Sequence, residues 1–256
     1  MNISNSSNRF LKFFGLFFLL LIVFSFQEKQ SGAPSKTIIV IPYQRMMHIS
    51  DADAEIADVS KISVKQVRIH MRNSITEKIS FALRDNFGVR LLTEIGTTRE
   101  KDDLNNFYDS ENFSLCKMEA ANQTANSNAD GRNNPYFSIF KKNNSIDYNA
   151  SYMNVSLSKP VLFQTIANDY EADYFLVLTQ LEIKTHYDEC FNIADKIFRR
   201  ELRLHYAFFD AGGNQLGGSY ASIEAASDMN TINRITQDVF PLLVKKVSDK
   251  VSMLIP

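Results

Sequence analysis

The segment Tyr174–Thr185 constrains the fold more than any other part of the chain, because its two halves carry different hydropathy patterns. The first half, Tyr174–Leu178, is apolar at every position, which is typical of a strand buried on both faces of a sheet. The second half alternates, with Leu181 and Ile183 on one face and polar residues on the other. This strand predicts a sheet whose centre is covered by helices on both sides and whose end lies in solvent.

Hydrophobic periodicity predicts the elements around this strand. Further strands are predicted at Thr37–Ile41, Val89–Thr93, Ile197–Phe209 and Gln215–Ala225. Three main helices are predicted at residues 63–87, 160–170 and 231–255. The predicted fold is a three-layer-like α/β (α+β) arrangement with a mixed sheet of about five strands. Its order is strand, helix, strand, insertion, helix, three strands, helix, preceded by an N-terminal signal helix.

Local signals mark where several of these elements begin, turn or bend. Ser63 and Gln66 form a capping-box pair at the start of the first helix. The segment Asp210–Asn214 contains two glycines and predicts a hairpin turn with positive φ. Pro241 lies inside the last helix, where its missing N–H predicts a kink.

The strand Ile197–Phe209 alternates strictly between apolar and polar residues over much of its length. Glu201, Arg203 and His205 share the polar face. Such alternation predicts an antiparallel strand with one face in solvent. His205 is therefore interpreted as a polar residue of the solvent face.

The first 26 residues are predicted to be a signal peptide or membrane anchor that directs export. Arg9 and Lys12 form a short basic region, and Phe13–Phe26 is an uncharged apolar run of 14 residues. A membrane-spanning helix needs about 20 apolar residues, so the short run favours cleavage, with Ser25 as the predicted cleavage site. An uncleaved anchor over residues 9–26 stays open as the alternative.

The remaining chain is predicted to be a polar linker over residues 27–36 and a single mixed α/β domain over residues 37–256. From about residue 97 to 158 the chain is rich in Asn and Ser, and from residue 109 on it is poor in aliphatic residues. This composition predicts a polar, partly disordered insertion. The predicted location is the periplasm or cell envelope, with membrane contact only through residues 9–26 if they are retained.

An acidic segment, Ser50–Glu55, follows the first predicted strand. Ser50 could cap a short helix, with Asp51, Asp53 and Glu55 near its positive end. The alternation of acidic residues also suggests a calcium loop. That loop requires more oxygen ligands, a glycine at the sharp turn and a distal glutamate. The segment lacks this pattern, so a helix start is favoured.

The chain contains two cysteines, Cys116 and Cys190. Outside the cytosol the two could form a disulfide, and two isolated thiols are an equally favoured alternative because spacing does not determine connectivity. Cys190 also lies near His186, Asp188 and Glu189, which together could chelate a metal. The ligand pattern is incomplete, so a solvated loop is favoured over a metal site.

No pattern in the sequence predicts catalytic, cofactor-binding or metal-ligating residues. The four histidines show no metal-ligand spacing, and no nucleophile elbow is present. The first strand is followed by Pro42 and Tyr43 where a glycine-rich phosphate loop would be needed. The chain is therefore predicted not to be an enzyme and to need no cofactor.

Three sequence features resemble an envelope domain shared by the curli secretion lipoprotein CsgG, the TolB amino-terminal domain and the penicillin-binding-protein activator LpoB. They are the strand end Ile41-Pro42-Tyr43, the step Glu171-Ala-Asp173-Tyr174, and the hairpin Leu202–Leu216 before a closing helix. The resemblance covers about residues 37–96 and 160–255. It implies a non-catalytic domain that acts through contacts with other envelope proteins. The chain lacks a lipobox cysteine and obvious membrane-inserting hairpins, so pore and translocation roles do not carry over.

The segment Met47-His-Ile-Ser-Asp-Ala-Asp53 resembles one found in uncharacterised exported proteins of Bacteroidetes. The predicted function is therefore that of an exported, non-catalytic envelope protein whose partners are other envelope proteins. Net charge is −1, which gives no reason to expect nucleic acid as a partner. Two alternatives stay open: an exported hydrolase that uses carboxylates, and a small-ligand binder with a cleft between sheet and insertion. The oligomeric state is not predicted.

Overall fold

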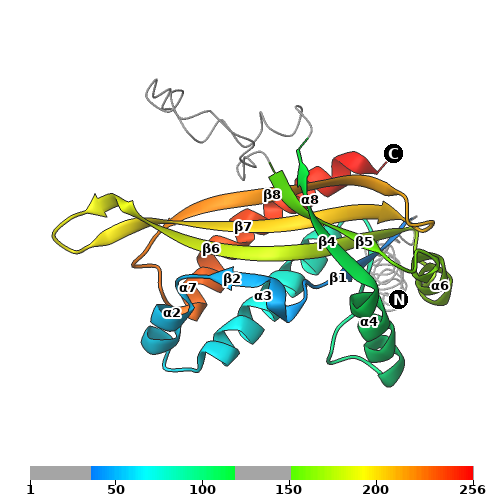
Figure 1. Cartoon of the computed structure of the whole chain (residues 1–256), viewed down its shortest axis with the longest axis horizontal. Helices are drawn as coiled ribbons and strands as arrows, with labels where there is room; N and C mark the ends of the chain where they lie inside the picture. Colours follow the sequence, from blue (N-terminus) through cyan, green and yellow to red (C-terminus); the bar gives the residue numbers. More distant parts are fainter. Residues whose placement is uncertain (1–35, 119–150, 256) are drawn as a thin grey trace, which may run out of the picture. The chain divides into compact units, whose positions relative to one another are not determined.

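The computed structural model describes residues 36–118 and 151–255. Its main feature is a six-stranded sheet in the order β3-β1-β6-β7-β8, with β2 added beside β6. The strands are β1 (Thr37–Ile41), β2 (His48–Ser50), β3 (Gly88–Leu91), β6 (Tyr174–Asn192), β7 (Ile197–Asp210) and β8 (Gln215–Ala226) (Figure 1). β1 pairs in parallel with β3 and β6, and β2 in parallel with β6. The β6–β7 and β7–β8 pairs are antiparallel, which confirms the predicted mixed sheet.

Helices cover both faces of this sheet, as predicted. They are α2 (Asp53–Ser60), α3 (Val64–Leu83), α4 (Thr98–Ser110), α6 (Val161–Tyr170), the short α7 (Ile232–Arg234) and α8 (Phe240–Leu254). One apolar core joins alternate residues of β1 and β6 to α2, α3 and α8. A second core joins the intervening residues of the same strands to α4 and α6. Successive residues of Tyr174–Leu178 therefore enter different cores, which explains why every position there is apolar.

The ends of the predicted insertion have regular structure. They form α4 and a second, two-stranded antiparallel sheet of β4 (Glu111–Lys117) and β5 (Ser151–Leu157). Leu104 and Phe107 of α4 and Val155 of β5 are buried in the second core. These few apolar residues are spaced for burial, and the surrounding Asn and Ser hide the pattern. Residues 119–150 of the insertion lie outside the described residues.

β5 crosses the face of β6, β7 and β8 that the alternation of β7 predicts to be in solvent (Figure 1). His205 is buried there, and its Nδ1 atom accepts a hydrogen bond of 3.0 Å from the backbone N–H of Met153. A bulge between Leu178 and Gln180 makes Thr179 an extra residue in β6. The Thr179 hydroxyl donates to the Met153 carbonyl at 2.6 Å. The interpretation of His205 as a solvent-facing residue is therefore wrong, because β5 covers it.

The helix signals read from the sequence have mixed outcomes. The capping box at Ser63 and Gln66 is present at the start of α3. The predicted kink at Pro241 takes another form: a π-helical segment, Ile235–Val239, precedes α8, and Pro241 lies in the first turn of α8. Residues 232–254 are helical without a break, so the π-helical turn directly before Pro241 accommodates the N–H that the proline lacks. The turn after β7 has the expected positive φ at Gly213 alone.

The predicted signal segment, with Arg9, Lys12 and Ser25, lies outside the described residues, as does nearly all of the predicted linker. Across residues 36–118 and 151–255, no helix has both the length and the apolar character needed to cross a membrane.

Candidate functional site

The hairpin of β6 and β7 continues past the strands that flank it, and we call residues 187–197 the arm. β2 pairs with β6 only as far as Ile183, and β8 pairs with β7 only from Arg199 onward. Figure 1 shows the arm, in yellow, projecting past β2 and β8. A two-stranded hairpin is marginally stable in water by itself. The arm is therefore a part of the sheet that a binding partner could stabilise.

Three large apolar side chains of the arm are exposed to solvent. The exposed fraction is 64% for Tyr187, 59% for Phe191 and 84% for Ile193. Tyr187 packs edge-on against Phe198, with ring centroids 5.3 Å apart, so its ring has a defined direction. Burying an apolar side chain of this size stabilises a structure by roughly 1.5–3 kcal/mol. Exposed apolar side chains on a projecting hairpin are candidates for a contact surface.

The root of the arm is held by Arg199 of β7, which links this strand to β6 and β8. Its Nε atom lies 2.6 Å from a carboxylate oxygen of Glu189 on β6, and its Nη1 atom lies 2.8 Å from Glu224 on β8. The hydrogen bonds from Arg199 hold the pKa of Glu189 below its usual range. The Arg199 side chain is itself largely buried. This arrangement fixes the direction in which the arm leaves the sheet.

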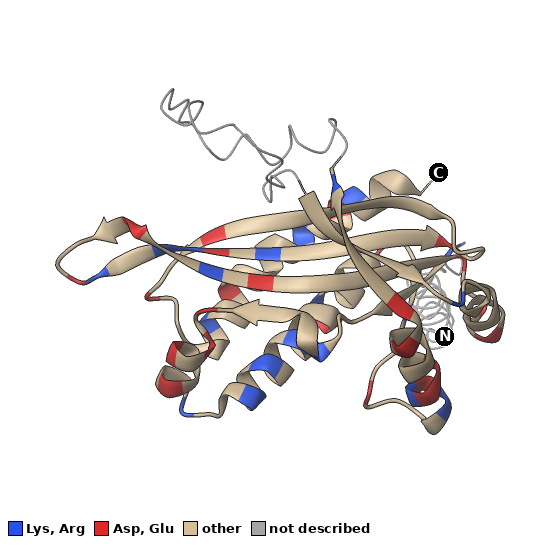
Figure 2. Cartoon of the chain, viewed as in Figure 1, with Lys and Arg blue, Asp and Glu red and all other residues tan. Residues whose placement is uncertain are grey.

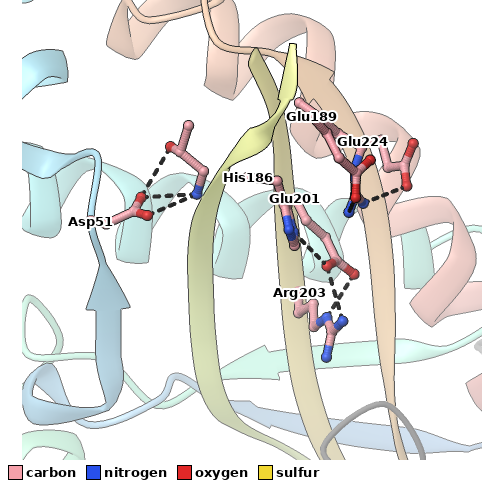
Figure 3. Close-up of polar contacts among 8 residues, drawn as sticks. Asp51, His186, Glu189, Glu201, Arg203 and Glu224 are labelled. Atoms are coloured by element: carbon pink, nitrogen blue, oxygen red, sulfur yellow. Dashed lines mark hydrogen bonds and ion pairs between the residues drawn. The ribbon is translucent and has the colours of Figure 1, made fainter. Parts of the chain in front are cut away.

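A second set of contacts ties the arm root to the segment before α2. The Asp51 carboxylate accepts hydrogen bonds from the backbone N–H and the hydroxyl of Thr185, at 2.8 and 3.1 Å (Figure 3). Arg200 is fully buried, and it donates to Thr185 at 3.2 Å and to Glu55 at 2.8 Å. Polar contacts on both faces of the hairpin therefore hold the root of the arm.

These contacts account for the acidic segment Ser50–Glu55. The predicted helix start is confirmed, since α2 begins at Asp53, but the predicted cap at Ser50 is wrong: Ala52 is the N-cap, no side chain caps the helix, and the Ser50 hydroxyl accepts a hydrogen bond from the Ala52 N–H instead. Asp51 and Glu55 bind the arm root, whereas Asp53 binds His48 and Arg68. In the described part of the chain, no three His, Cys, Asp or Glu side chains gather where they could hold a metal ion.

The residues His186, Asp188, Glu189 and Cys190 do not form one cluster. His186 approaches Glu201 at 3.5 Å, and Glu201 in turn binds Arg203 at 2.6 Å (Figure 3). Glu189 binds Arg199, and the Cys190 thiol donates to the carbonyl of Ile197. Alternation along β6 and a register shift after His186 direct these side chains to different neighbours.

Cys116 and Cys190 are free thiols in the structure. Cys116 pairs in register with Tyr152, whose ring lies against Gly218, and Gly218 pairs with Ala207 of β7. Cys190 pairs with Phe198 of β7, and Phe198 lies nine residues before Ala207 on that strand. A strand rises about 3.3 Å per residue, so the points of β7 nearest to the two thiols are roughly 30 Å apart. That separation is too large for a disulfide.

Sequence patterns do not identify the exposed residues of the arm as functional. The segment reads as a polar connection, in which His186–Lys196 joins two strands. One signal in the sequence could have identified them. Three large apolar residues, Tyr187, Phe191 and Ile193, lie among polar neighbours, and a solvated loop does not need them.

Comparisons with known proteins do not assign the chain to a family. No family model matches the sequence, and no curated protein matches it significantly. Solved structures that match include lipoprotein GNA1162 from Neisseria meningitidis, at 12% identity and a TM-score of 0.33, covering 85% of this chain and 99% of that one. Hypothetical protein CT253 from Chlamydia trachomatis matches at 12% identity and a TM-score of 0.37, covering 85% of this chain and 98% of that one. The resemblance to CsgG, TolB and LpoB is not confirmed by these matches.

Proposed function

We propose that this chain is an exported, non-catalytic protein of the cell envelope that acts by binding another envelope protein through its arm. Export is supported by the sequence of residues 9–26, with its basic start and apolar run. The observation that carries the binding role is the exposure of Tyr187, Phe191 and Ile193 on a hairpin whose root is fixed by ion pairs. A rigid root lowers the entropy lost when such an element binds.

The charge of the arm favours a protein over a lipid surface as its partner. Three carboxylates, Asp188, Glu189 and Asp195, and one lysine, Lys196, lie between residues 187 and 197. An anionic lipid surface repels an acidic hairpin, because the surface potential there is negative. The expected partner surface is an apolar groove bordered by Lys or Arg side chains.

Site-specific photo-crosslinking in intact cells tests this proposal. A photoreactive phenylalanine analogue at Ile193 is expected to yield a defined protein adduct. The same analogue at Met253, which is 81% exposed at the end of α8, serves as the control and yields no adduct of that size. Substituting Tyr187→Ser and Phe191→Ser in the Ile193 probe should abolish the adduct without lowering the melting temperature, because both side chains are exposed. Adducts with lipid, or identical protein adducts from both probe positions, would contradict the proposal.

The alternative of a carboxylate hydrolase gains no support from the cavity that lies beside α3 at the carboxyl ends of β1 and β3. Two carboxylates, Glu77 and Glu94, lie in its wall. Burial raises the pKa of Glu94, but hydrogen bonds and charges from Arg45 and Arg72 outweigh burial and hold it below the usual range. A general acid at neutral pH needs the opposite shift.

A further inference from the structure

A cavity lies beside α3, where β1 and β3 end. Its volume is about 720 Å³, within the range of pockets that hold small molecules. Its wall comes from the loop after β1, from α3 and from the segment after β3. Both strands are parallel neighbours, and the cavity lies outside their carboxyl ends. In open α/β sheets, ligands bind outside the carboxyl ends of the strands.

The wall of the cavity carries more positive than negative charge. Arg45, Lys65, Arg68 and Arg72 line it, against the two carboxylates Glu77 and Glu94. Lys65, Arg68 and Arg72 follow one another at spacings of three and four residues, so they lie along one side of α3. Figure 2 shows Lys and Arg in blue along this helix. The excess of cations favours an anionic ligand.

Two of these cations already have structural roles. Arg72 is buried, and it donates to the Tyr43 carbonyl at 2.6 Å and to the Tyr108 hydroxyl at 2.6 Å. It also pairs with Glu94 at 3.1 Å, and Arg45 pairs with the same carboxylate. One carboxylate therefore balances part of the charge of both guanidinium groups.

Arg68 and Lys65 are the cations available to a ligand. The Nε atom of Arg68 binds Asp53 at 2.6 Å, and its terminal N–H groups have no hydrogen-bond partner within residues 36–118 and 151–255. A guanidinium has five N–H donors, so most of this fork is open. Lys65 lies one turn earlier on the same side of the helix and is exposed.

A buried chain of polar groups fixes the direction of Arg68. The Tyr43 hydroxyl lies 3.2 Å from His48 Nδ1, and His48 Nε2 lies 3.0 Å from Asp53 Oδ1. Burial raises the pKa of Asp53, but hydrogen bonds from His48 and Arg68 outweigh burial and hold it below its usual range. An ionised, buried Asp53 orients Arg68 before any ligand arrives, which reduces the entropy lost on binding.

The rest of the cavity is largely apolar. Val64 and Ile69 of α3, Leu91 of β3 and Ile95 of the following segment contribute to its wall. Ile95 is 76% exposed, so most of its side chain is open to a ligand. A ligand that placed apolar groups against Ile95 and Ile69 would remove this surface from water.

We propose that this cavity binds a small amphipathic carboxylate. The carboxylate accepts hydrogen bonds from the terminal N–H groups of Arg68 and from the Lys65 ammonium. The apolar body lies against Val64, Ile69 and Ile95. This site is separate from the arm and does not depend on the function proposed for it.

Calorimetric titration of the full chain with three ten-carbon probes tests the proposal, at concentrations below micelle formation. Decanoate is expected to bind at least tenfold more tightly than decanol, and decyltrimethylammonium to bind weakest. Arg68→Met should weaken decanoate binding by roughly 10- to 100-fold, as expected for loss of a charge-assisted hydrogen bond, and leave decanol binding unchanged. Lys101→Met, on an exposed face of α4, is the matched control and should change neither.

Equal binding of decanoate and decanol, or decanoate binding that Arg68→Met does not weaken, would overturn the proposal. If Arg68→Met lowers the melting temperature, Lys65→Met answers the same question, because Lys65 is exposed. Ile95→Ser should weaken both decanoate and decanol, since it removes part of the apolar wall. A variant at Ile95 that binds both probes as the parent does would place the apolar body elsewhere and contradict the assignment.

Discussion

The imidazole of His205 on β7 accepts a hydrogen bond of 3.0 Å from the backbone N–H of Met153 on β5. A backbone N–H can only donate, so Nδ1 carries no proton and Nε2 carries one. The Nε2 atom faces Glu182 at 3.6 Å. On the other side of the same residue, the Met153 carbonyl accepts the Thr179 hydroxyl. Both polar groups of one β5 residue are thus satisfied by side chains of the sheet beneath it.

Removing the acceptor should destabilise the protein without changing its fold. His205→Leu leaves the Met153 N–H without a partner where β5 lies on the sheet, and an unsatisfied buried donor costs about 1–3 kcal/mol. Urea unfolding monitored by circular dichroism measures the loss. His70→Leu is the matched control, because His70 is exposed on α3, and its effect should stay within about 0.5 kcal/mol. Equal effects of the two substitutions would show that the hydrogen bond does not hold β5 in place.

The same pair of residues shows what the sequence can and cannot predict. Alternation along β7 correctly places Glu201, Arg203 and His205 on one face. It does not reveal what covers that face, because the cover comes from β5, which lies about fifty residues earlier in a segment dominated by Asn and Ser. Contacts between distant segments leave no periodic trace in either one.

The cavity is hidden from sequence reasoning for a related reason. Arg45, Arg68 and Arg72 belong to two elements, and their spacing matches no motif. By contrast, the all-apolar run at Tyr174–Leu178 and the capping box at Ser63 are local patterns, and both predict the structure correctly. Interactions between residues close in sequence determine the helices and strands, whereas the cavity forms where the ends of these elements meet.

The turn between β7 and β8 should tolerate alanine at one glycine and not at the next. Gly213 has a φ of 81°, and an added Cβ would lie 2.6 Å from the Phe163 ring. Gly212 has no positive φ, and an added Cβ would meet only side-chain atoms of Asp210 and Asn214 at 3.2 Å or more. Gly213→Ala should cost about 1–3 kcal/mol and Gly212→Ala less than about 1 kcal/mol. Thermal unfolding of both variants measures this; equal melting temperatures would contradict it.

Glu111 should make stability depend on pH. Burial raises the pKa of its carboxyl to about 8, although a hydrogen bond from Gln44 and the charge of Arg72 act in the other direction. The pKa in the unfolded chain is about 4.3. The folded state therefore keeps the proton longer, so this contribution to stability is complete below pH of about 4 and is lost as the pH rises to about 8.

Glu111→Gln should remove this dependence. Relative to the parent, the variant should gain roughly 2–4 kcal/mol in the free energy of unfolding between pH of about 4 and 8. The measurement is a series of urea unfolding curves across that pH range. Glu77→Gln, at an exposed position of α3, is the control and should show a nearly constant difference. A constant difference for Glu111→Gln as well would mean that the carboxyl ionises in the folded protein as it does in the unfolded chain.

The outer edge of β8 is protected from pairing with another strand by two lysines of α8. In the sheet order β8 is a terminal strand, and its backbone is open on one side. The Lys246 ammonium donates to the Ser222 carbonyl at 2.8 Å, and the Lys250 ammonium lies 3.5 Å from the Tyr220 carbonyl. Lysines placed over an edge strand prevent edge-to-edge association.

The double substitution Lys246→Ala and Lys250→Ala should therefore expose these carbonyls and produce self-association that increases with protein concentration in sedimentation velocity. Lys245→Ala removes a neighbouring lysine that pairs with Asp249 on the exposed side of α8, and it should sediment as the parent does. Sedimentation of the double variant that matches this control at every concentration would show that the lysines do not guard the edge.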